Sequence, residues 1–520
     1  MTLVFSKMGF ALLMQLLAAA LLLVVVNADV ERIEGFRMDG VRLIATRAFA
    51  AGAAITKVPW RSILSKDSAQ ETSWLLKYLD PEDGVLPPGL PHWVMQADEV
   101  VIALQLSALE QESSEWRSWL ARAEAGLNGT ALWSSEQRAW LEGSYCLQFT
   151  NEHAGRLAKK LASVYEPLAA HDSATFSDAV SSHGSTHVSL GRLRHLLDVV
   201  AAHALVPSGM GRLVLLPLPL LRLEHGGLAR LTVSHGGEGG GGEGGGGEGE
   251  GGVELRAVRP ISVGAELTID ALGYDVAALM ARQGDPGVDP RSCAVPPAFG
   301  TGCNGAAVTL PITLSLDLHD SLAPFKRALL AKASLKAEGH AFVLRLSHAT
   351  GLPAPPSSLL AYARLAVLEP HDRPLLPPDE AMPLAPLSAS NEEHAFRLIA
   401  ASLEAKLAGY ASAVEEDEFE LSSHAARGAG GGGGGARARG RSGSRGGGSG
   451  IDGSRERRLA AVATVLLEKR LLAATLGQLQ DDLLAFQAGE PVEPPVLPPP
   501  RSKKKRKRNK KVRGDAKSEL

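Results

Sequence analysis

The sequence predicts an α+β protein: a β-rich region that carries a long helical insert, followed by an all-α region. Apolar and polar side chains alternate over residues 41–46, as in a half-buried strand, and short strand-like runs return between residues 213 and 258. The stretch from about 66 to 205 has a mostly helical pattern. From Pro311 onward apolar residues recur every three or four positions. We therefore expect two foldable regions, at 29–292 and 305–486.

Composition places the chain among ordinary globular proteins with an unusual tail. The chain has 520 residues, of which 45% are hydrophobic, so there is room for two or three domains. The formal net charge of −3 hides two unlike parts, because residues 501–520 hold eleven Lys and Arg against two Asp and Glu. The remaining body is mildly acidic. Nothing in that body indicates a nucleic-acid-binding face, and no specific nucleic acid is expected as a partner.

Two Gly-rich segments interrupt the foldable regions. Residues 235–252 are almost entirely Gly with regularly spaced Glu, and residues 427–450 are rich in Gly, Arg and Ser. Such segments bury too little apolar surface to offset the entropy lost on ordering. We expect 235–252 to be a disordered extension of a hairpin and 427–450 to be a linker between two helices. Residues 487–520 form a Pro-rich and then basic tail.

The first 28 residues have the pattern of a secretory signal peptide. Lys7 precedes an apolar run from Gly9 to Val26, and Val26-Asn27-Ala28 offers the small residues that signal peptidase requires. The run borders on the length that spans a bilayer, so an uncleaved signal anchor is the alternative. In both cases the body would be translocated, and membrane contact is expected only if the segment stays uncleaved.

Three short motifs bear on the compartment. The C-terminal Lys517-Ser518-Glu519-Leu520 resembles the KDEL retrieval signal, and Asn128-Gly129-Thr130 is an N-glycosylation sequon. The basic run 503–508 would act as a nuclear localisation signal in a cytosolic protein. The first prediction is therefore the endoplasmic reticulum lumen, within the secretory pathway, and the alternative is the nucleus.

The cysteine and histidine patterns predict no metal site. Three cysteines are too few for a disulfide framework and lack the spacing of metal ligands. Cys293 and Cys303 either form one bridge in an oxidising compartment or are two unrelated thiols. The histidines of the insert are loosely spaced, with no carboxylate or cysteine to complete a site. They are His183, His187 and His195.

Three separate stretches together resemble one family. Residues 39–47, Asp-Gly-Val-Arg-Leu-Ile-Ala-Thr-Arg, are similar to the G-x-G-L-x-A-x-R opening strand of SET domains. Residues 258–269 are similar to the closing x-R-x-I-x-x-G-E-E-L-x-I. Between them, residues 114–120 and 133–144 resemble the helical insert of the Rubisco large-subunit methyltransferase branch. The third stretch follows that branch's C-terminal signature at Ser357–Leu365, Asn391–Glu393, Leu403–Tyr410, Glu415–Asp417 and Arg458–Leu472.

The resemblance covers residues 35 to 480 approximately and implies a SET-domain β-fold with a helical insert, followed by an all-α substrate-binding domain. It also implies a protein-lysine N-methyltransferase that uses S-adenosyl-L-methionine. In such enzymes the methyl donor and the lysine enter from opposite faces, and the site aligns a neutral amine for in-line transfer, without a metal. The implied partner is a protein substrate, and a monomer is expected. A histidine target is the alternative, because both occur among relatives of this architecture.

Site residues follow from the resemblance position by position. Gly40, Arg42 and Leu43 in the opening strand, with Glu224 and His225 in the segment Leu221-Arg222-Leu223-Glu224-His225 that stands for the family's Asp-x-x-Asn-His motif, are the implied cofactor contacts. Tyr274 is the candidate catalytic tyrosine, although a packing role is the competing interpretation. His225 fits a structural hydrogen-bonded histidine equally well, and Glu266 is expected to stabilise the fold.

The sequence also departs from the family pattern at several of these positions. Arg42 replaces the second Gly of the strand, and Glu224 replaces an Asn, so a carboxylate that only accepts hydrogen bonds stands in place of an amide. Ala271 occupies the simplest position for the catalytic Tyr. His203 stands where an Arg contacts the cofactor carboxylate, and Asp285 where an aromatic shields the channel. Two hypotheses follow: an active methyltransferase, or a catalytically impaired SET-like protein that binds a client.

Overall fold

The computed structural model describes most of the two predicted regions. The described residues are 33–39, 42–68, 98–171, 188–218, 221–234, 251–271, 274–288, 307–346, 353, 355–377, 381–429 and 450–488. Several predictions fall outside them: the N-terminal segment 1–28, Gly40, most of the segments 235–252 and 427–450, and almost all of the tail 487–520. Cys293, Cys303, His183 and His187 also lie outside them. The α+β fold class is confirmed within the described part.

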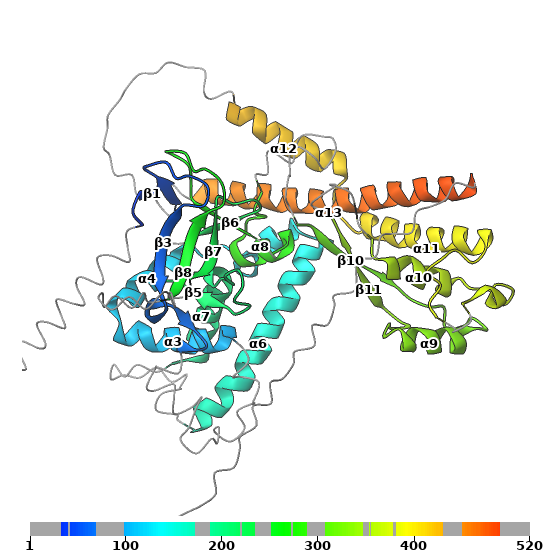
Figure 1. The fold of residues 1–520 in the computed structure, drawn as a ribbon, viewed down its shortest axis with the longest axis horizontal. Coiled ribbons are helices and arrows are strands. Elements are labelled where there is room, and N and C mark those ends of the chain that lie inside the picture. Colours follow the sequence, from blue (N-terminus) through cyan, green and yellow to red (C-terminus); the bar gives the residue numbers. More distant parts are fainter. Residues whose placement is uncertain are drawn as a thin grey trace, which may run out of the picture. The chain divides into compact units, whose positions relative to one another are not determined.

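A five-stranded mixed sheet forms the centre of the β-rich region (Figure 1). Three strands are antiparallel neighbours, and the short last strand runs parallel to its neighbour. Alternate side chains of the strands, such as Ile55, Leu231 and Leu255, pack into one apolar core. The sheet order is β3 (Ala54–Pro59), β8 (Gly252–Ala257), β7 (Ala229–Ser234), β9 (Thr268–Asp270) and β6 (Arg222–Glu224).

Two small antiparallel pairs accompany this sheet. β1 (Phe36–Asp39) pairs with β2 (Arg42–Ala45), and β4 (Leu64–Ser65) pairs with β5 (Val214–Leu215). The segment 235–252 joins β7 to β8, and these strands stay paired as far as Ser234 and Gly252. The hairpin predicted around this segment is therefore present at its base.

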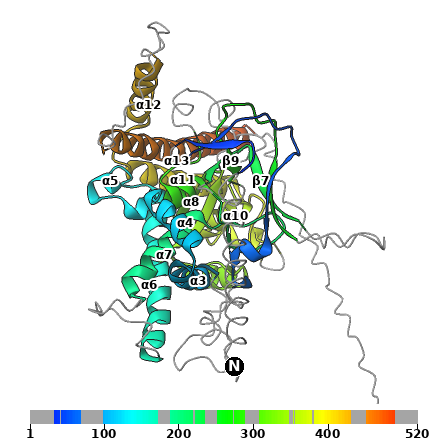
Figure 2. The ribbon, with the colours of Figure 1, turned by 90° about the vertical axis from the view of Figure 1, so that its left-hand side faces the viewer.

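The predicted helical insert lies between β4 and β5. Its helices bury a second apolar core that includes Ile102, Leu120 and Leu197. Serine side chains start two of them, because Ser113 accepts from Trp116 N and Ser189 accepts from Arg192 N. Figure 2 shows the long α6 beside α7. The helices are α3 (Asp98–Glu112), α4 (Ser114–Ala125), η4 (Thr130–Leu132), α5 (Ser135–Ala139), α6 (Tyr145–His171) and α7 (Leu190–His203), and η1 (Trp60–Ser62) precedes β4.

After β9 the chain turns into α8 (Val276–Gln283), which positions the last part of the site. Asp275 caps this helix by accepting from Ala278 N. Gly284 ends it with a φ of 65°, a left-handed conformation that favours glycine. The capped start and the glycine end fix where residues 283–287 leave the helix.

The C-terminal region is mainly helical, with a two-stranded sheet that the helical prediction missed. β10 (Thr309–Leu314) pairs with β11 (His340–Arg345). Leu310, Ile312 and Leu314 are buried while the residues between them are more exposed, which is a period of two rather than 3.6. The helices are α9 (Ala323–Lys332), α10 (Ser357–Ala366), η6 (Arg373–Leu375), α11 (Ala389–Ala408), α12 (Val414–Ala429) and α13 (Gly450–Gln487).

The chain divides into two compact units that do not follow the sequence order. The first combines Met1–Ile312 with Val343–Ala354 and Leu403–Leu476, and the second combines Thr313–Phe342, Pro355–Ser402 and Gly477–Leu520. α12 and most of α13 therefore belong with the sheet and the insert. The domain boundaries expected at 292 and 305 stay predictions.

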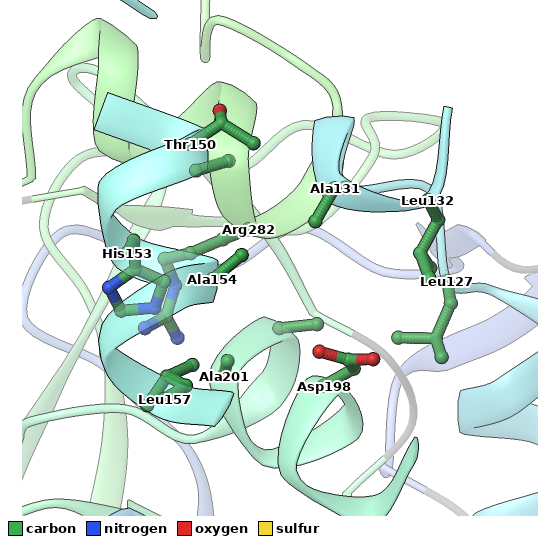
Figure 3. Close-up of a pocket in the computed structure, with 13 residues that line it drawn as sticks. Leu127, Ala131, Leu132, Thr150, His153, Ala154, Leu157, Asp198, Ala201 and Arg282 are labelled. Atoms are coloured by element: carbon green, nitrogen blue, oxygen red, sulfur yellow. The ribbon is translucent and has the colours of Figure 1, made fainter. Parts of the chain in front are cut away.

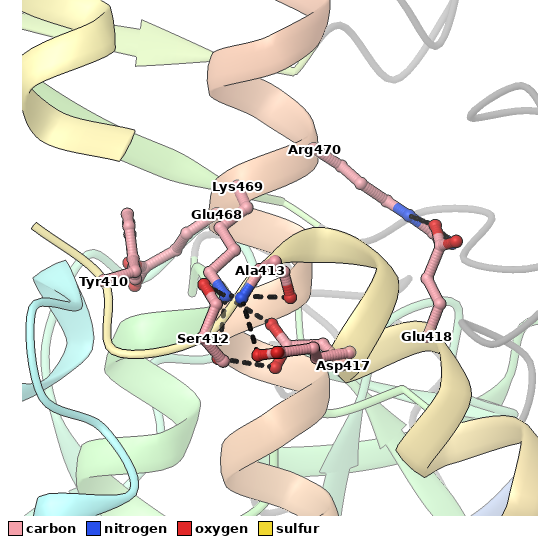
Figure 4. Close-up of polar contacts among 9 residues, drawn as sticks. Tyr410, Ser412, Ala413, Asp417, Glu418, Glu468, Lys469 and Arg470 are labelled. Carbon is pink, nitrogen blue, oxygen red and sulfur yellow. Dashed lines mark hydrogen bonds and ion pairs between the residues drawn. The ribbon is translucent and has the colours of Figure 1, made fainter. Parts of the chain in front are cut away.

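The residues of the C-terminal signature form buried polar contacts. Glu468 accepts from the backbone N–H groups of Tyr145 (2.8 Å) and Cys146 (2.9 Å) and from the Tyr410 hydroxyl (2.7 Å). It thereby satisfies two N–H groups in the first turn of α6. Next to it, Lys469 Nζ contacts Asp417 Oδ2 (2.6 Å) and the Ser412 carbonyl (2.7 Å), as Figure 4 shows.

The second unit holds a comparable buried pair. Arg364 donates two hydrogen bonds of 2.6 Å to Glu392, and Asn391 donates to the Arg364 carbonyl. Arg364 and Glu392 are 5% and 2% exposed, too little for a ligand to reach. The signature that carried the family resemblance therefore holds helices together, since buried charges require paired, hydrogen-bonded partners.

Candidate functional site

A cleft of about 720 Å³ lies in the first unit, beside the edge of the sheet where β6 is located. It is lined by the start of β2, the loop after α4, the end of α7, the start of β6, the segment after α8 and the first turns of α13. This volume lies within the range of about 300–1,000 Å³ typical of small-molecule sites. The charged and histidine side chains that line it are Arg42, His203, Arg222, Glu266, Asp285, Glu456 and Arg457.

The two predicted cofactor contacts of the opening strand that the structure describes, Arg42 and Leu43, face different surroundings. Arg42 lines the cleft, with its side chain 59% exposed and its Nη1 3.8 Å from Glu266 Oε2. Leu43 is 3% exposed and belongs to the sheet core, and its carbonyl accepts from Leu267 N at 2.7 Å. Of the predicted cofactor contacts in this strand, Arg42 is thus the one whose side chain a ligand in the cleft can reach.

Glu224 and His225 stand at the end of β6, next to the end of β9. Glu224 is in register with Asp270, and its carbonyl accepts from Ala271 N at 3.0 Å. His225 N donates to Gly287 O at 2.8 Å, which ties this turn to the segment after α8. The structure therefore places Glu224 and His225 beside the end of β9, but neither is among the residues that line the cleft, and their cofactor role stays a prediction.

An ion pair occupies the wall where the family has aromatic residues. Arg222 Nε and Nη2 contact Asp285 Oδ2 at 3.0 and 2.8 Å, and both side chains are about one-third exposed. Burial alone would lower the pKa of Arg222, but Asp285, with Glu224 and Glu266, raises it above its ordinary value. Arg222 therefore keeps its positive charge in this wall.

His203 lines the cleft at the end of α7 but carries no charge near neutral pH. Its ring packs edge-on against Trp119, with the centroids 6.0 Å apart. Burial and, to a lesser degree, the nearby Arg282 lower the pKa of His203 to about 4, although the Ala123 carbonyl, which accepts a hydrogen bond from Nε2, acts in the opposite direction. The position cannot supply a cation to a bound carboxylate at pH 7.

Tyr274 lies one turn beyond β9, between the sheet core and α8. Its backbone N–H donates to the Ala271 carbonyl, and its ring packs against the sheet core. The Arg282 guanidinium stands over the ring, 4.6 Å from its centroid. Ala271 itself is 2% exposed. Tyr274 remains the candidate catalytic residue, held in place by a stacked arginine rather than by the cleft walls.

A second, much smaller cavity lies behind the cleft, among α6, α7 and α8 (Figure 3). His153, Asp198 and Arg282 point toward it from these three helices. Burial raises the pKa of Asp198 and lowers that of His153. With a volume of about 30 Å³ it has room for one or two water molecules and is too small for a cofactor.

Sequence reasoning missed the contribution of α13 to the cleft. Arg457 reaches from α13 to Asn128 in the loop after α4, with its Nε 2.6 Å from Asn128 Oδ1. The two residues are 329 positions apart, and the intervening Gly-rich segment conceals any relation in sequence. Among the described residues, no group of histidine, cysteine and carboxylate side chains could hold a metal ion. No helix in this described part is long and apolar enough to cross a membrane.

Comparisons with known proteins agree with this architecture. Residues 317–472 match the family model described as Rubisco LSMT substrate-binding. A crystal structure of the SET domain of LSMT bound to lysine and AdoHcy has a TM-score of 0.61, with 18% identity, over 89% of this chain and 91% of that one. A structure of Rubisco LSMT bound to AdoMet has a TM-score of 0.57, with 17% identity, over 87% and 89%. A comparison with curated proteins finds no match.

The predicted resemblance is thereby confirmed at the level of fold. The chain has the SET fold of LSMT, and residues 317–472 match the Rubisco LSMT substrate-binding family model.

Proposed function

We propose that this chain is an S-adenosyl-L-methionine-dependent protein-lysine N-methyltransferase. The observation that carries the proposal is the cleft of about 720 Å³, which Arg42 lines together with Arg222 at the start of β6. Glu224 and His225 follow at the other end of the same strand and are not among the residues that line the cleft. The similar fold of LSMT, whose structures contain AdoMet, AdoHcy or lysine, supports the same choice of ligands. The cleft fits such a cofactor in size and in its mixture of charged and apolar walls.

Each residue then has a role that its chemistry allows. The Glu224 carboxylate can accept the hydrogen bonds of an adenine amino group, and the cations at Arg42 and Arg222 suit a carboxylate. The bound sulfonium supplies an electrophilic methyl group. The chain must exclude water and orient a neutral lysine amine, for which the Tyr274 hydroxyl is the candidate acceptor.

Two single substitutions test binding and chemistry separately. Glu224→Ala is expected to weaken AdoMet binding by about tenfold in calorimetry, as the loss of one hydrogen bond of about 1.4 kcal/mol predicts. The exposed Glu142→Ala is the matched control. Tyr274→Phe keeps the ring beneath Arg282 and is expected to bind AdoMet normally while losing label transfer to a protein substrate. Folded wild-type protein that neither binds AdoMet nor transfers label would refute the proposal.

A second candidate is a client-binding protein without methyltransferase activity. The Arg222–Asp285 ion pair favours it, because charged side chains replace the expected aromatic shield, and the neutral His203 removes a cation. Binding of a client by the full chain, with no AdoMet binding, would select this function over the first.

We also propose that the protein substrate is held by the Rubisco LSMT-type substrate-binding region, that the chain is a monomer, and that it resides in the endoplasmic reticulum lumen. The N-terminal signal pattern and the KSEL ending support the location. A fluorescent protein inserted after residue 32 should co-localise with a lumenal marker. Nuclear fluorescence would select the alternative location.

A further inference from the structure

Asn128 has two possible uses that compete with each other. In the sequence it is the acceptor position of the Asn128-Gly129-Thr130 sequon. In the structure it lines the cleft and receives Arg457 from α13. The threonine of the sequon is buried, because Thr130 is 0% exposed and its hydroxyl lies 2.6 Å from that of Thr150.

The hydrogen bond from Arg457 fixes which way the Asn128 amide points. Arginine Nε can only donate, so the atom 2.6 Å away must be the carbonyl oxygen Oδ1. The amide nitrogen Nδ2 therefore points away from Arg457 and toward Gly284, where a methyl group built on that glycine would lie 2.9 Å from Nδ2. Asn128, which is half-buried, Gly284 and Arg457 all line the cleft, so a group attached to Nδ2 would extend from the cleft wall.

Arg457 connects the first turns of α13 to two parts of the insert. Besides Asn128, its Nη1 donates to Gln137 Oε1 in α5 at 3.2 Å. Gly453, Glu456, Leu459 and Ala460 of the same turns also line the cleft. The contact between Arg457 and Asn128 therefore joins this cleft wall to the loop after α4.

We propose that Asn128 is a positioning residue that holds the first turns of α13 against the cleft, and that an N-glycan at this sequon is incompatible with the formed cleft. The inference rests on the proposed function, in which the cleft receives the cofactor. Glycosylation replaces one N–H hydrogen of Nδ2 with a bond to the anomeric carbon, and the lipid diphosphate of the oligosaccharide donor leaves. The attached sugar would either fill the cleft or displace Arg457.

Hydrogen exchange and calorimetry test the positioning role on the full chain. Asn128→Ala removes the acceptor and is expected to speed amide exchange in residues 453–460 by about tenfold and to weaken AdoMet binding by a similar factor, as the loss of a hydrogen bond to a charged group predicts. Asn128→Asp keeps an acceptor oxygen and should behave as wild type in both measurements. Asn151→Ala changes an exposed asparagine of α6 and serves as the matched control.

Unchanged exchange in residues 453–460 of Asn128→Ala would overturn the proposal. If that variant does not fold, Arg457→Met tests the same hydrogen bond from α13 and keeps the aliphatic stem. Amide exchange tests the contact between Arg457 and Asn128 independently of AdoMet binding. A wild-type protein that fails to bind AdoMet would therefore count against the proposed function alone.

Expression in a secretory host, with an added N-terminal sequon that reports entry into the lumen, tests the glycan. Mass spectrometry of the Asn128 peptide should show folded protein unmodified there, or a modified fraction with faster exchange in residues 453–460. Protein modified at Asn128 with the slow exchange of unmodified protein would disprove the incompatibility.

Discussion

At the scale of single residues, His203 makes the stability of the protein depend on pH. Its pKa is about 4 in the folded chain and 6.5 in the unfolded chain, so the unfolded chain binds more protons between these values. Stability is therefore lost as pH falls below about 6.5. Between pH 7 and pH 5 the loss is at most about 2 kcal/mol.

Urea unfolding at the two pH values measures this loss. His203→Gln should lose less stability than wild type on acidification, because the neutral amide takes up no proton. His319→Gln, at an exposed position, should retain the wild-type dependence. Equal acid sensitivity of wild type and His203→Gln would contradict the assignment.

At the scale of residues, features carried by neighbouring residues could be predicted from the sequence, whereas contacts between distant residues could not. The position of Glu224 and His225 at a strand end could be predicted because His225 matches a motif that follows a strand in the family, whereas their cofactor role stays a prediction. The Arg222–Asp285 ion pair could not, because its partners are 63 residues apart and Asp285 stands where the family has an aromatic residue. Burial is what makes His203 neutral, and no residue type reveals burial by itself.

At the scale of elements, the contact between α12 and α13 depends on one buried ion pair. Lys469 and Asp417 are 1% and 4% exposed. Lys469→Met leaves the Asp417 carboxylate without its cation, so we expect a loss of about 3–5 kcal/mol in the free energy of unfolding. The neighbouring Arg470–Glu418 pair joins the same helices at a more exposed position (Figure 4).

Arg470→Ala should cost less than about 1 kcal/mol, which makes it the matched control for Lys469→Met. The double variant Lys469→Met with Asp417→Leu should recover part of the loss, since no charge is then buried alone. If Lys469→Met and Arg470→Ala lower the free energy of unfolding by the same amount, burial does not determine how much an ion pair contributes here.

The β7–β8 hairpin gives a second prediction at this scale. Its strands pair in register up to Ser234 and Gly252, so replacing residues 236–250 with Asn-Gly should leave the sheet intact. A shorter connection loses less conformational entropy when the two strands pair, so we expect an unchanged or higher melting temperature. A lower melting temperature would mean that residues 236–250 stabilise the fold through contacts of their own.

Element types were predictable where the spacing of apolar residues stays regular over many residues, as in the insert and in α11. The pair β10–β11 was missed because each strand has six residues and Pro311 lies inside the first. Proline lacks the N–H that a central strand needs, yet a two-stranded sheet has free edges that tolerate it.

At the scale of the whole molecule, the order of regions along the chain was predictable but their grouping was not. The predicted SET boundary near residue 292 stays a prediction, but nothing in the sequence indicates that Leu403–Leu476 belongs to the same compact unit as Met1–Ile312. The reason is physical: Glu468 of α13 satisfies the first N–H groups of α6, and the buried Leu466, Leu467 and Leu471 belong to the same unit. The C-terminal helix α13 thus supplies hydrogen-bond acceptors that α6, more than 300 residues earlier, needs at its first turn.

This grouping predicts that the SET region does not fold by itself. A fragment of residues 29–312 leaves the first turn of α6 without its carboxylate acceptor and exposes apolar surface that α13 covers, so we expect no cooperative thermal transition. A fragment of residues 29–488 should unfold cooperatively. Within it, Glu468→Ala should cost about 3 kcal/mol, because it leaves two N–H groups and the Tyr410 hydroxyl unsatisfied. Glu468→Gln keeps one acceptor oxygen and should cost less. Scanning calorimetry distinguishes these cases, and a cooperative transition of 29–312 matching that of 29–488 would show that the SET region is an independent domain after all.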